Sequence, residues 1–261
     1  MHTIRNYIMA ESLEQAWELN QKGRNNIIIG GNLWLKMGKR NIINAIDLSS
    51  LGLDKIEEDE GGFRIGCMAT LHDIETHEGL NKEFQNLFKE AVRHIVGVQF
   101  RNCATIGGSI FPKLGFSDVL TAFLACDTQV ILYKKGEVPL REFIYIPTDN
   151  DILTHLYVKK DGRKTAYESF RMTETDFPTI TCAMAKTQDG FETVLGARPK
   201  HAEVVVDEVV ADAFSSEEVA DYAKRVIGKL QYGSNIRGSE QYRKQLSKVL
   251  IGRCISRLTE E

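Results

Sequence analysis

The sequence predicts an α+β fold, in which short apolar strands are interspersed with capped amphipathic helices. Helix-start signals recur: Ser12-Leu13-Glu14-Gln15 and Ser215-Ser216-Glu217-Glu218 each place a hydroxyl three residues before a side chain that completes a capping box. The β-branched run Ile27-Ile28-Ile29 favours a buried strand. Gln188-Asp189-Gly190 lies between two apolar runs, which is typical of a β-hairpin.

The N-terminal stretch predicts a small subdomain with a β-α-β-like start. A helix is expected from Ser12 to about residue 22, because apolar residues recur there at helical spacing. Strands are expected at 27–29 and 43–48, where the composition is apolar and β-branched.

The central stretch predicts further short strands and helices. Thr70-Leu71-His72-Asp73 resembles a capping box with Asp in place of Glu. Apolar residues at helical spacing predict one helix over 83–95, and Ser117 is placed to cap a helix over 118–125. The short extended segments expected here are 55–57, 63–66, 128–133, 139–143 and 152–158.

The pattern changes after Lys159-Lys160-Asp161-Gly162, which predicts a boundary and a C-terminal subdomain. The hairpin turn at 188–190 separates strands at 179–185 and 191–195. The remaining elements expected here are a strand at 204–206 and helices at 215–230 and 240–258.

The length, net charge and composition of the chain limit the classes of protein to which it can belong. At 261 residues the chain is long enough for one large domain or two smaller ones. Its net charge of -3 gives no electrostatic footprint for nucleic acid. No apolar run approaches the roughly 20 residues of a membrane span, and the N-terminus lacks the apolar core of a signal peptide. We therefore expect a cytoplasmic protein.

The five cysteines form no Cys-x-x-Cys spacing, so the sequence predicts no zinc or iron–sulfur ligand cluster. Scattered cysteines in odd number favour buried, reduced thiols. The histidines show no metal-ligand spacing, and no metal site is expected. Gly-x-Gly-x-x-Gly, Gly-x-Ser-x-Gly and P-loop signatures are absent from the sequence.

Two double glycines are the main candidates for a ligand site. Thr105-Ile106-Gly107-Gly108 and Ile28-Ile29-Gly30-Gly31-Asn32 each combine an apolar anchor with two positions that lack a side chain. Such positions let a ligand approach bare backbone N–H groups, which together form an anion-binding nest. The alternative for either pair is a tight turn with a small-residue packing site.

The stretch Gln99-Phe100-Arg101-Asn102-Cys103-Ala104-Thr105-Ile106-Gly107-Gly108-Ser109-Ile110, with the earlier double glycine and Ser117-Asp118, resembles the FAD-binding subunit of the molybdenum hydroxylases. This is the family of the xanthine dehydrogenase and carbon monoxide dehydrogenase medium subunits. The resemblance runs over almost the whole chain. It implies a fold of the vanillyl-alcohol oxidase (PCMH-like) type, with an N-terminal FAD-binding subdomain (1–54), a central FAD-binding subdomain (55–162) and a C-terminal flavoprotein subdomain (163–261).

The resemblance implies that both glycine loops bind the pyrophosphate of FAD in the cleft between the first two subdomains. The loop residues carried over are Ile29, Gly30, Gly31, Asn32, Leu33, Trp34, Thr105, Ile106, Gly107, Gly108 and Ser109. Leu33 stands where the family usually has a small polar residue, so this loop is either shortened or lacks one side-chain contact. Ser109 replaces an Asn that is common in the family and keeps a hydroxyl.

Four more residues match family positions near FAD. Asp118 would accept hydrogen bonds from ribose hydroxyls, or act only as a charge at a helix start. Ile95 would pack near the flavin, or belong to a helix core. The backbone of Leu153 would meet the flavin ring, and Arg171 would lie near its N1–C2 side, unless it is a surface arginine on a strand. Asp176-Phe177-Pro178 resembles a family loop that lies beside the ring and gates access of the acceptor.

The function implied by the resemblance is electron transfer. Electrons from a molybdenum subunit would pass through an iron–sulfur subunit to FAD, which delivers them in pairs, commonly to NAD+. The partners implied are a [2Fe-2S] subunit and a molybdopterin-binding subunit, and no catalytic acid or base is expected in this chain. Two alternatives remain: a scaffold subunit that has lost FAD, and a free-standing FAD oxidase.

Overall fold

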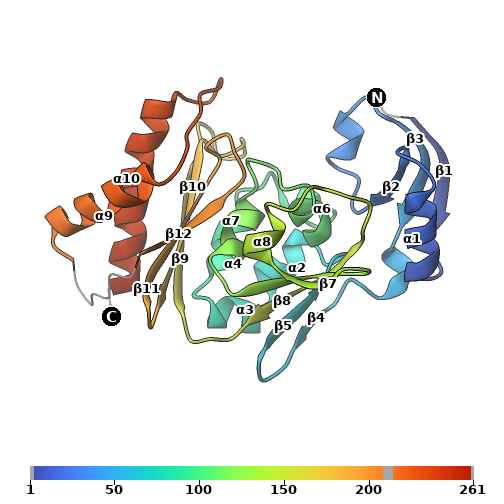
Figure 1. Cartoon of the computed structure of the whole chain (residues 1–261), viewed down its shortest axis with the longest axis horizontal. Coiled ribbons are helices and arrows are strands. Elements are labelled where there is room, and N and C mark those ends of the chain that lie inside the picture. The colour runs from blue at the N-terminus through green and yellow to red at the C-terminus, as the bar shows by residue number, and fades with distance from the viewer. Residues whose placement is uncertain (1–2, 208–213, 260–261) are drawn as a thin grey trace. The chain divides into compact units, whose positions relative to one another are not determined.

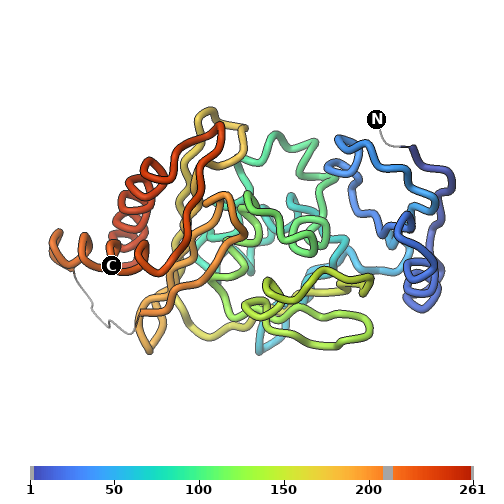
Figure 2. Tube along the Cα trace, turned by 45° about the horizontal axis from the view of Figure 1, so that its top comes forward, coloured from blue at the N-terminus to red at the C-terminus, as the bar shows by residue number. Residues whose placement is uncertain are grey.

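The computed structural model describes residues 3–207 and 214–259 of the chain. The contacts divide the chain into two units, and each unit is assembled from three separate stretches. Unit 1 comprises Met1–Asp73, Val98–Pro112 and Thr128–Val158, and unit 2 comprises Ile74–Gly97, Lys113–Asp127 and Lys159–Glu261. Figure 2 traces the path of the chain by residue number. The three-part division expected from the sequence stays a prediction.

A parallel three-stranded sheet opens unit 1. Its order is β1 (Thr3–Met9), β3 (Asn41–Asp47), β2 (Asn26–Ile29), with α1 (Leu13–Gln21) between the first two strands in the sequence (Figure 1). The Ser12 hydroxyl accepts the Gln15 N–H and caps α1, as predicted. The strand β1 was not predicted, because its apolar residues show no regular alternation; most of its residues are exposed.

The second sheet of unit 1 has five strands, in the order β4-β5-β8-β6-β7. They are β4 (Ile56–Glu58), β5 (Gly62–Gly66), β8 (Leu153–Lys159), β6 (Thr128–Leu132) and β7 (Gly136–Pro139). Short helical elements accompany the two sheets: η1 (Leu35–Met37), η2 (Ser49–Leu51), α5 (Val98–Arg101), α6 (Ile106–Ile110) and α8 (Leu140–Phe143). The predicted segment at 139–143 is therefore mainly the helix α8. The helix α2 (Leu71–Thr76) begins in unit 1 and ends in unit 2.

Unit 2 is built on an antiparallel sheet in the order β12-β11-β10-β9. The strands are β9 (Lys164–Phe170), β10 (Ile180–Thr187), β11 (Gly190–Gly196) and β12 (Glu203–Asp207). The helices are α3 (Glu78–Glu83), α4 (Leu87–Val92), α7 (Asp118–Leu124), α9 (Ser216–Gly228) and α10 (Glu240–Thr259). The predicted hairpin is confirmed, because Thr187 pairs with Gly190 across the turn.

Helices cover both faces of this sheet (Figure 1). Cys182 and Met184 pack with residues of α9 and α10 in one buried cluster. Thr181, which points to the opposite face, lies 2.9 Å from the Thr121 hydroxyl on α7. This double cover explains why six successive residues at the start of β10 are buried, and it makes unit 2 a three-layer arrangement.

The single helix expected at 83–95 is wrong. The chain forms α3 and α4, separated at Gln85 and Asn86, whose φ angles of 45° and 62° are left-handed. The buried Asn81 stabilises this break, because its side chain accepts the Lys89 N–H and donates to the Ile74 carbonyl. The apolar residues at helical spacing still face the core, so their periodicity did not reveal the break.

A half-buried histidine in unit 1 predicts a pH-dependent stability. Burial, and then the charge of Arg64, lower the pKa of His155 to about 4 from an ordinary 6.5. As the pH falls from 6.5 towards 4, the unfolded chain takes up a proton that the folded chain does not, so stability is lost in that window. Allowing for solvent screening, the loss is about 1 kcal/mol. His155→Gln should flatten the pH dependence of urea unfolding, and an unchanged slope would contradict this.

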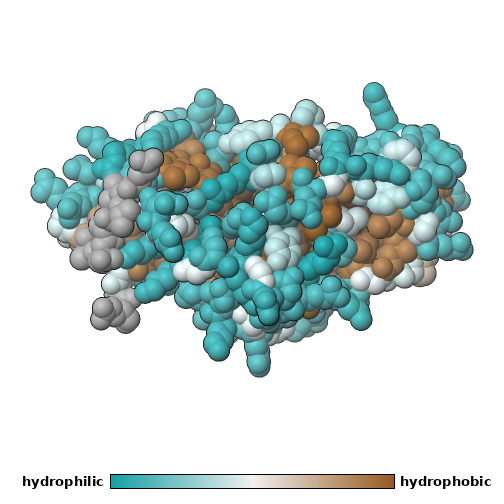
Figure 3. All heavy atoms as spheres, turned by 60° about the horizontal axis from the view of Figure 1, so that its bottom comes forward, coloured by the Kyte–Doolittle hydropathy of each residue, from teal (hydrophilic) through white to brown (hydrophobic). Residues whose placement is uncertain are grey.

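The exterior is mostly hydrophilic on the face drawn in Figure 3, where apolar side chains gather only in small groups. Among the residues that the structure describes, no helix is both long and apolar enough to cross a membrane.

Candidate functional site

The two glycine loops meet in unit 1. Gly30 and Gly31 follow the last residue of β2, and the second loop begins at Thr105. A Cβ on Gly30 would lie 2.3 Å from the Thr105 hydroxyl oxygen, and a Cβ on Gly31 would lie 1.7 Å from the Cys103 carbonyl oxygen. The loops are therefore in direct contact, and only glycine fits at either position of the first loop.

The first loop has free backbone donors. Within residues 3–207 and 214–259, the structure shows no hydrogen bond donated by the N–H groups of Gly30, Gly31, Asn32 or Leu33. Asn32 is left-handed, with φ of 53°. Its buried side-chain oxygen has no hydrogen-bond partner. A run of free N–H groups fits an anionic ligand group such as a pyrophosphate, and the unpartnered Asn32 Oδ1, an acceptor, fits a donor elsewhere on the same ligand.

The second loop is satisfied within the protein. The N–H groups of Ile106 and Gly107 donate to the carbonyls of Ala69 and Cys67 at 2.9 and 2.8 Å. The Thr105 hydroxyl accepts the Gly108 N–H at 3.2 Å and caps α6. A Cβ on Gly107 would lie 2.9 Å from Cys67, so glycine is required here for packing. Free backbone donors, which the sequence predicts for both loops, are therefore found in the first loop. At Gly107 the alternative holds, in which glycine is needed for close packing.

The other predicted residues of unit 1 differ in exposure. Ile29 and Leu153 are buried in the core, and the indole of Trp34 is 46% exposed. Leu33, which stands where the resemblance leads to a small polar residue, is half-buried. The Ser109 hydroxyl donates to the Thr105 carbonyl at 2.9 Å and is thereby part of the loop's internal bonding.

Asp118 and Arg171 meet in unit 2. Asp118 is the first residue of α7 and is buried. Its Oδ1 accepts hydrogen bonds from the Tyr167 hydroxyl at 2.5 Å and from Arg171 Nη2 at 2.7 Å. Burial raises the pKa of Asp118, while the charge of Arg171 and the Tyr167 hydrogen bond act in the opposite direction. The Arg171 side chain is only 6% exposed, so the surface alternative for this arginine is wrong.

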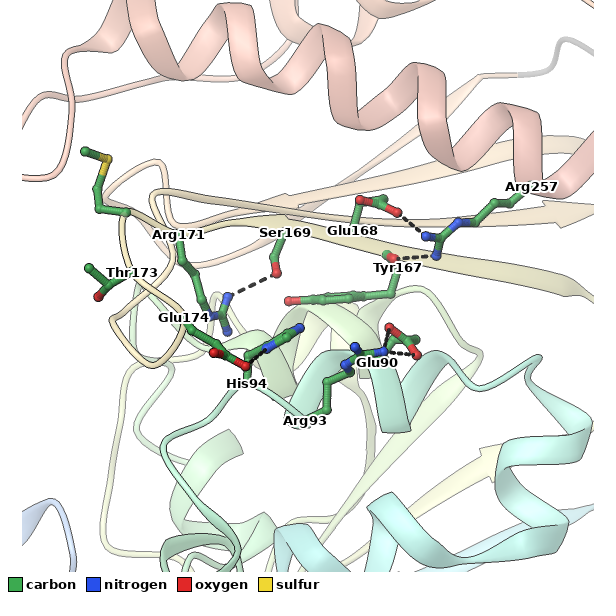
Figure 4. A pocket seen from close by; sticks show the side chains of 11 residues that line it. Glu90, Arg93, His94, Tyr167, Glu168, Ser169, Arg171, Thr173, Glu174 and Arg257 are labelled. Atoms are coloured by element: carbon green, nitrogen blue, oxygen red, sulfur yellow. Dashed lines mark hydrogen bonds and ion pairs between the residues drawn. The ribbon is translucent and has the colours of Figure 1, made fainter.

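A pocket of about 410 Å³ adjoins this pair in unit 2 (Figure 4). Its lining residues are Glu90, Arg93, His94, Tyr167, Glu168, Ser169, Arg171, Met172, Thr173, Glu174 and Arg257. Burial, and then the charges of Arg93 and Arg171, lower the pKa of His94, so its imidazole is neutral at neutral pH. Ile95, predicted to lie near the flavin, directly follows His94.

Two arginine–glutamate ion pairs are among the residues that line the pocket. Arg93 Nη1 lies 2.9 Å from Glu90, and Arg257 Nη2 lies 2.5 Å from Glu168. Three arginines and three glutamates line the pocket, so with a neutral His94 the formal charge of the lining is zero. The pocket therefore offers polar contacts without an excess of either charge.

Sequence reasoning missed Tyr167 and Ser169, because β9 was not predicted. In a strand, residues two apart share a face. The alternation Tyr167, Ser169, Arg171 would have placed all three side chains together, had the strand been recognised.

The loop after β9 is anchored by an arginine. Arg237 Nη2 lies 2.9 Å from Asp176 Oδ1, and this hydrogen bond is the main reason that the pKa of Asp176 is lowered. The same guanidinium lies 5.0 Å from the Phe177 ring centre. Phe177 packs on Phe116 with ring centres 4.4 Å apart. The segment that resembles the family's gating loop is thus fixed at its Asp-Phe pair.

The described residues contain no group of three or more His, Cys, Asp or Glu side chains placed to hold a metal ion. All five cysteines are free thiols, and Cys103 is the exposed one.

A mixed α and β fold with a glycine loop that presents free backbone N–H groups is typical of proteins that bind an anionic cofactor. The chain belongs to the family described as the FAD binding domain in molybdopterin dehydrogenase, whose sequence profile matches residues 2–158. It is accordingly an FAD-binding oxidoreductase subunit of the molybdenum hydroxylase class, as the resemblance implied.

Relatives match over nearly the whole chain. The glyceraldehyde dehydrogenase medium chain of Sulfolobus acidocaldarius is 27% identical over 266 residues, covering 94% of each chain. The 6-hydroxypseudooxynicotine dehydrogenase complex subunit alpha of Paenarthrobacter nicotinovorans is 24% identical and covers 96% of this chain and 93% of its own. A chain of the carbon monoxide dehydrogenase of Hydrogenophaga pseudoflava has the same fold, with a TM-score of 0.86, 22% identity and coverage of 97% and 96%.

Proposed function

We propose that this chain is the FAD-carrying electron-transfer subunit of a multi-subunit, xanthine dehydrogenase-like molybdenum hydroxylase. Its partners would be a [2Fe-2S] subunit and a molybdopterin-binding subunit, and its acceptor NAD+ or another oxidant. Two relatives are named as a "medium chain" and a "complex subunit alpha", which supports membership of a complex. We also propose the vanillyl-alcohol oxidase type of fold, the three subdomains given above and a cytoplasmic location.

The observation that carries the proposal is the first glycine loop. Gly30 to Leu33 present free N–H groups, and Asn32 presents a buried oxygen without a partner. The N–H groups would hold the FAD pyrophosphate, while Asn32 Oδ1, which can only accept, would take a donor from another part of the cofactor. Thr105 lies against Gly30 and limits how the loop can move. FAD itself supplies the redox chemistry when bound. In unit 2, Arg171 would place a positive charge beside the flavin ring, and Ile95 would pack near that ring. Asp118, proposed from the resemblance to accept ribose hydroxyls, accepts from Arg171 and Tyr167 at Oδ1.

The chain needs no acid or base for this role. Its residues set the position, the solvent access and the electrostatics of the cofactor. We therefore assign binding residues and no catalytic residue.

A comparison of flavins tests the proposal. The purified chain, titrated with FAD, FMN and riboflavin, should bind FAD and show the visible bands of oxidised flavin. FMN lacks the pyrophosphate and adenosine, so its affinity should be at least tenfold lower, a difference of about 1.4 kcal/mol. Equal affinity for FAD and FMN would contradict the assignment of the first loop. Absence of FAD binding would favour the scaffold alternative.

Co-purification tests the proposed partners and acceptor. When the chain is co-expressed with candidate iron–sulfur and molybdopterin subunits, a stable complex with bound FAD is expected. Bleached flavin in that complex should be reoxidised by NAD+ at a rate that depends on the NAD+ concentration. Reoxidation only by other oxidants would identify a different acceptor.

A further inference from the structure

Arg171 keeps one buried donor without an acceptor. In the part of the chain that the structure describes, the buried side-chain nitrogen and oxygen atoms without a partner are Arg171 Nε and Asn32 Oδ1. A buried donor loses its hydrogen bonds to water and gains none in return, so unpaired buried donors are rare in folded proteins. The unpaired Nε therefore indicates that a ligand supplies the missing acceptor.

The rest of the guanidinium is fixed by the protein. Arg171 Nη2 bonds Asp118 Oδ1 at 2.7 Å, and Nη1 donates to the Ser169 hydroxyl at 3.0 Å. Figure 4 shows Arg171, Ser169 and Tyr167 along one side of the pocket. Because the guanidinium is planar and rigid, fixing two of its nitrogens also fixes the direction in which Nε points.

Asp118 is in turn fixed by Tyr167. The Tyr167 hydroxyl bonds the same carboxylate oxygen that receives Arg171. Burial and the nearby Asp118 raise the pKa of Tyr167 well above its ordinary value, so the phenol stays protonated and is the donor. Tyr167, Asp118 and Arg171 thus form a chain of contacts that ends at the free Nε.

The charge of the pocket restricts the acceptor. Arginines and glutamates balance in the lining, and the rim arginines Arg93 and Arg257 already have carboxylate partners. A phosphate would therefore meet no surplus positive charge. A neutral planar ring with a carbonyl or ring-nitrogen acceptor fits better, and the edge of the flavin ring has these groups.

We propose that Tyr167 is a positioning residue whose hydroxyl, through Asp118, orients Arg171 so that its Nε donates to the acceptor edge of the flavin ring. The inference rests on the proposed function, which places Arg171 at the ring. Its new content is the role of Tyr167, which lies outside both glycine loops. The hydroxyl controls a donor to the flavin without touching the flavin itself.

Tyr167→Phe tests this role. The substitution keeps the ring that lines the pocket and removes the hydroxyl, so Asp118 loses one donor and Arg171 gains freedom to turn. The dissociation constant of FAD, measured by flavin fluorescence, should rise about fivefold. The preference for reduced over oxidised flavin should fall about tenfold, which lowers the two-electron midpoint potential by about 30 mV.

Tyr222→Phe is the matched control. Tyr222 is also fully buried in unit 2, and its hydroxyl lies 2.7 Å from Thr193, among residues that do not line the pocket. The Tyr222→Phe variant should lose as much thermal stability as Tyr167→Phe. Its FAD affinity and midpoint potential should equal those of the unsubstituted chain. Ser169→Ala, which frees Arg171 Nη1, should lower the potential in the same direction by a smaller amount, and it provides the test if Tyr167→Phe does not fold.

The outcomes are distinguishable. Equal shifts in Tyr167→Phe and Tyr222→Phe, or no shift in potential in Tyr167→Phe and Ser169→Ala, would overturn the positioning role while FAD binding stands. Failure of the unsubstituted chain to bind FAD would overturn the proposed function, and the inference with it.

Discussion

Gly31→Ala is expected to deprive the chain of FAD. The added Cβ would lie 1.7 Å from the Cys103 carbonyl oxygen and 2.5 Å from its carbon, and these backbone atoms cannot rotate away. The first loop must therefore shift, which moves the free N–H groups of Gly30 to Leu33 out of their arrangement. We expect FAD affinity to fall at least a hundredfold, or about 2.8 kcal/mol. Stability should fall by about 1–3 kcal/mol. Flavin content after purification and a fluorescence titration measure the effect.

Gly23→Ala is the control for this substitution. Gly23 precedes the same strand β2, and a Cβ there would meet nothing within 4 Å. The variant should retain FAD and remain within about 0.5 kcal/mol of the unsubstituted chain. If Gly31→Ala kept its FAD as Gly23→Ala does, the close contact of the two loops would not control cofactor binding.

The helix starts and the hairpin could be predicted because their signals are local. Ser117 and Ser215 accept N–H groups three residues ahead, and both caps form as expected. Thr70 and Asp73 bond each other's backbone N–H groups, which completes the capping box in which Asp replaces Glu. In each case the partners lie within one helical turn, so a short window of sequence contains the whole interaction.

The contacts between the side chains of the candidate site could not be predicted, because the residues that form them are distant from one another in the sequence. Tyr167 bonds Asp118 from 49 positions away, and β9, which carries Tyr167, has too many polar residues to be recognised as a strand. The break at Gln85 and Asn86 has a similar origin. The side chain of Asn81 favours the break, and the apolar spacing of the flanking helices does not report it.

The double glycines were recognised from the sequence, but the distant residues that contact them could not be predicted either. Their sequence indicates positions where a Cβ is not tolerated, but not the atoms that exclude it. The structure shows that a second loop lies against Gly30 and Gly31, and that Cys67 lies against Gly107. Glycine is thus required for packing of the protein at all three positions, and only the first loop also has free N–H groups for a ligand.

Arg198→Met should destabilise unit 2 by about 3–5 kcal/mol. The Arg198 side chain is fully buried. Nε and Nη1 donate to the carbonyls of Leu195 and Gln231 at 3.0 and 2.7 Å, and Nη2 donates to the carbonyl of His201 at 3.0 Å. Nη2 also lies 3.0 Å from a Glu203 carboxylate oxygen. Methionine fills a similar length but donates nothing, so three carbonyls and a carboxylate lose their partner at once.

Arg225→Met is the control for Arg198→Met, because it removes an exposed ion pair without removing a buried arginine. Arg225 is 47% exposed in its side chain, and its Nε lies 3.2 Å from Asp207. Solvent-exposed pairs contribute at most about 1 kcal/mol, so this variant should unfold close to the unsubstituted chain. Guanidinium unfolding followed by circular dichroism compares the two. Arg198 connects the end of β11, the approach to β12 and the segment between α9 and α10, so its loss should release all three together. Equal midpoints for the two variants would mean that these segments are held by the apolar cluster alone.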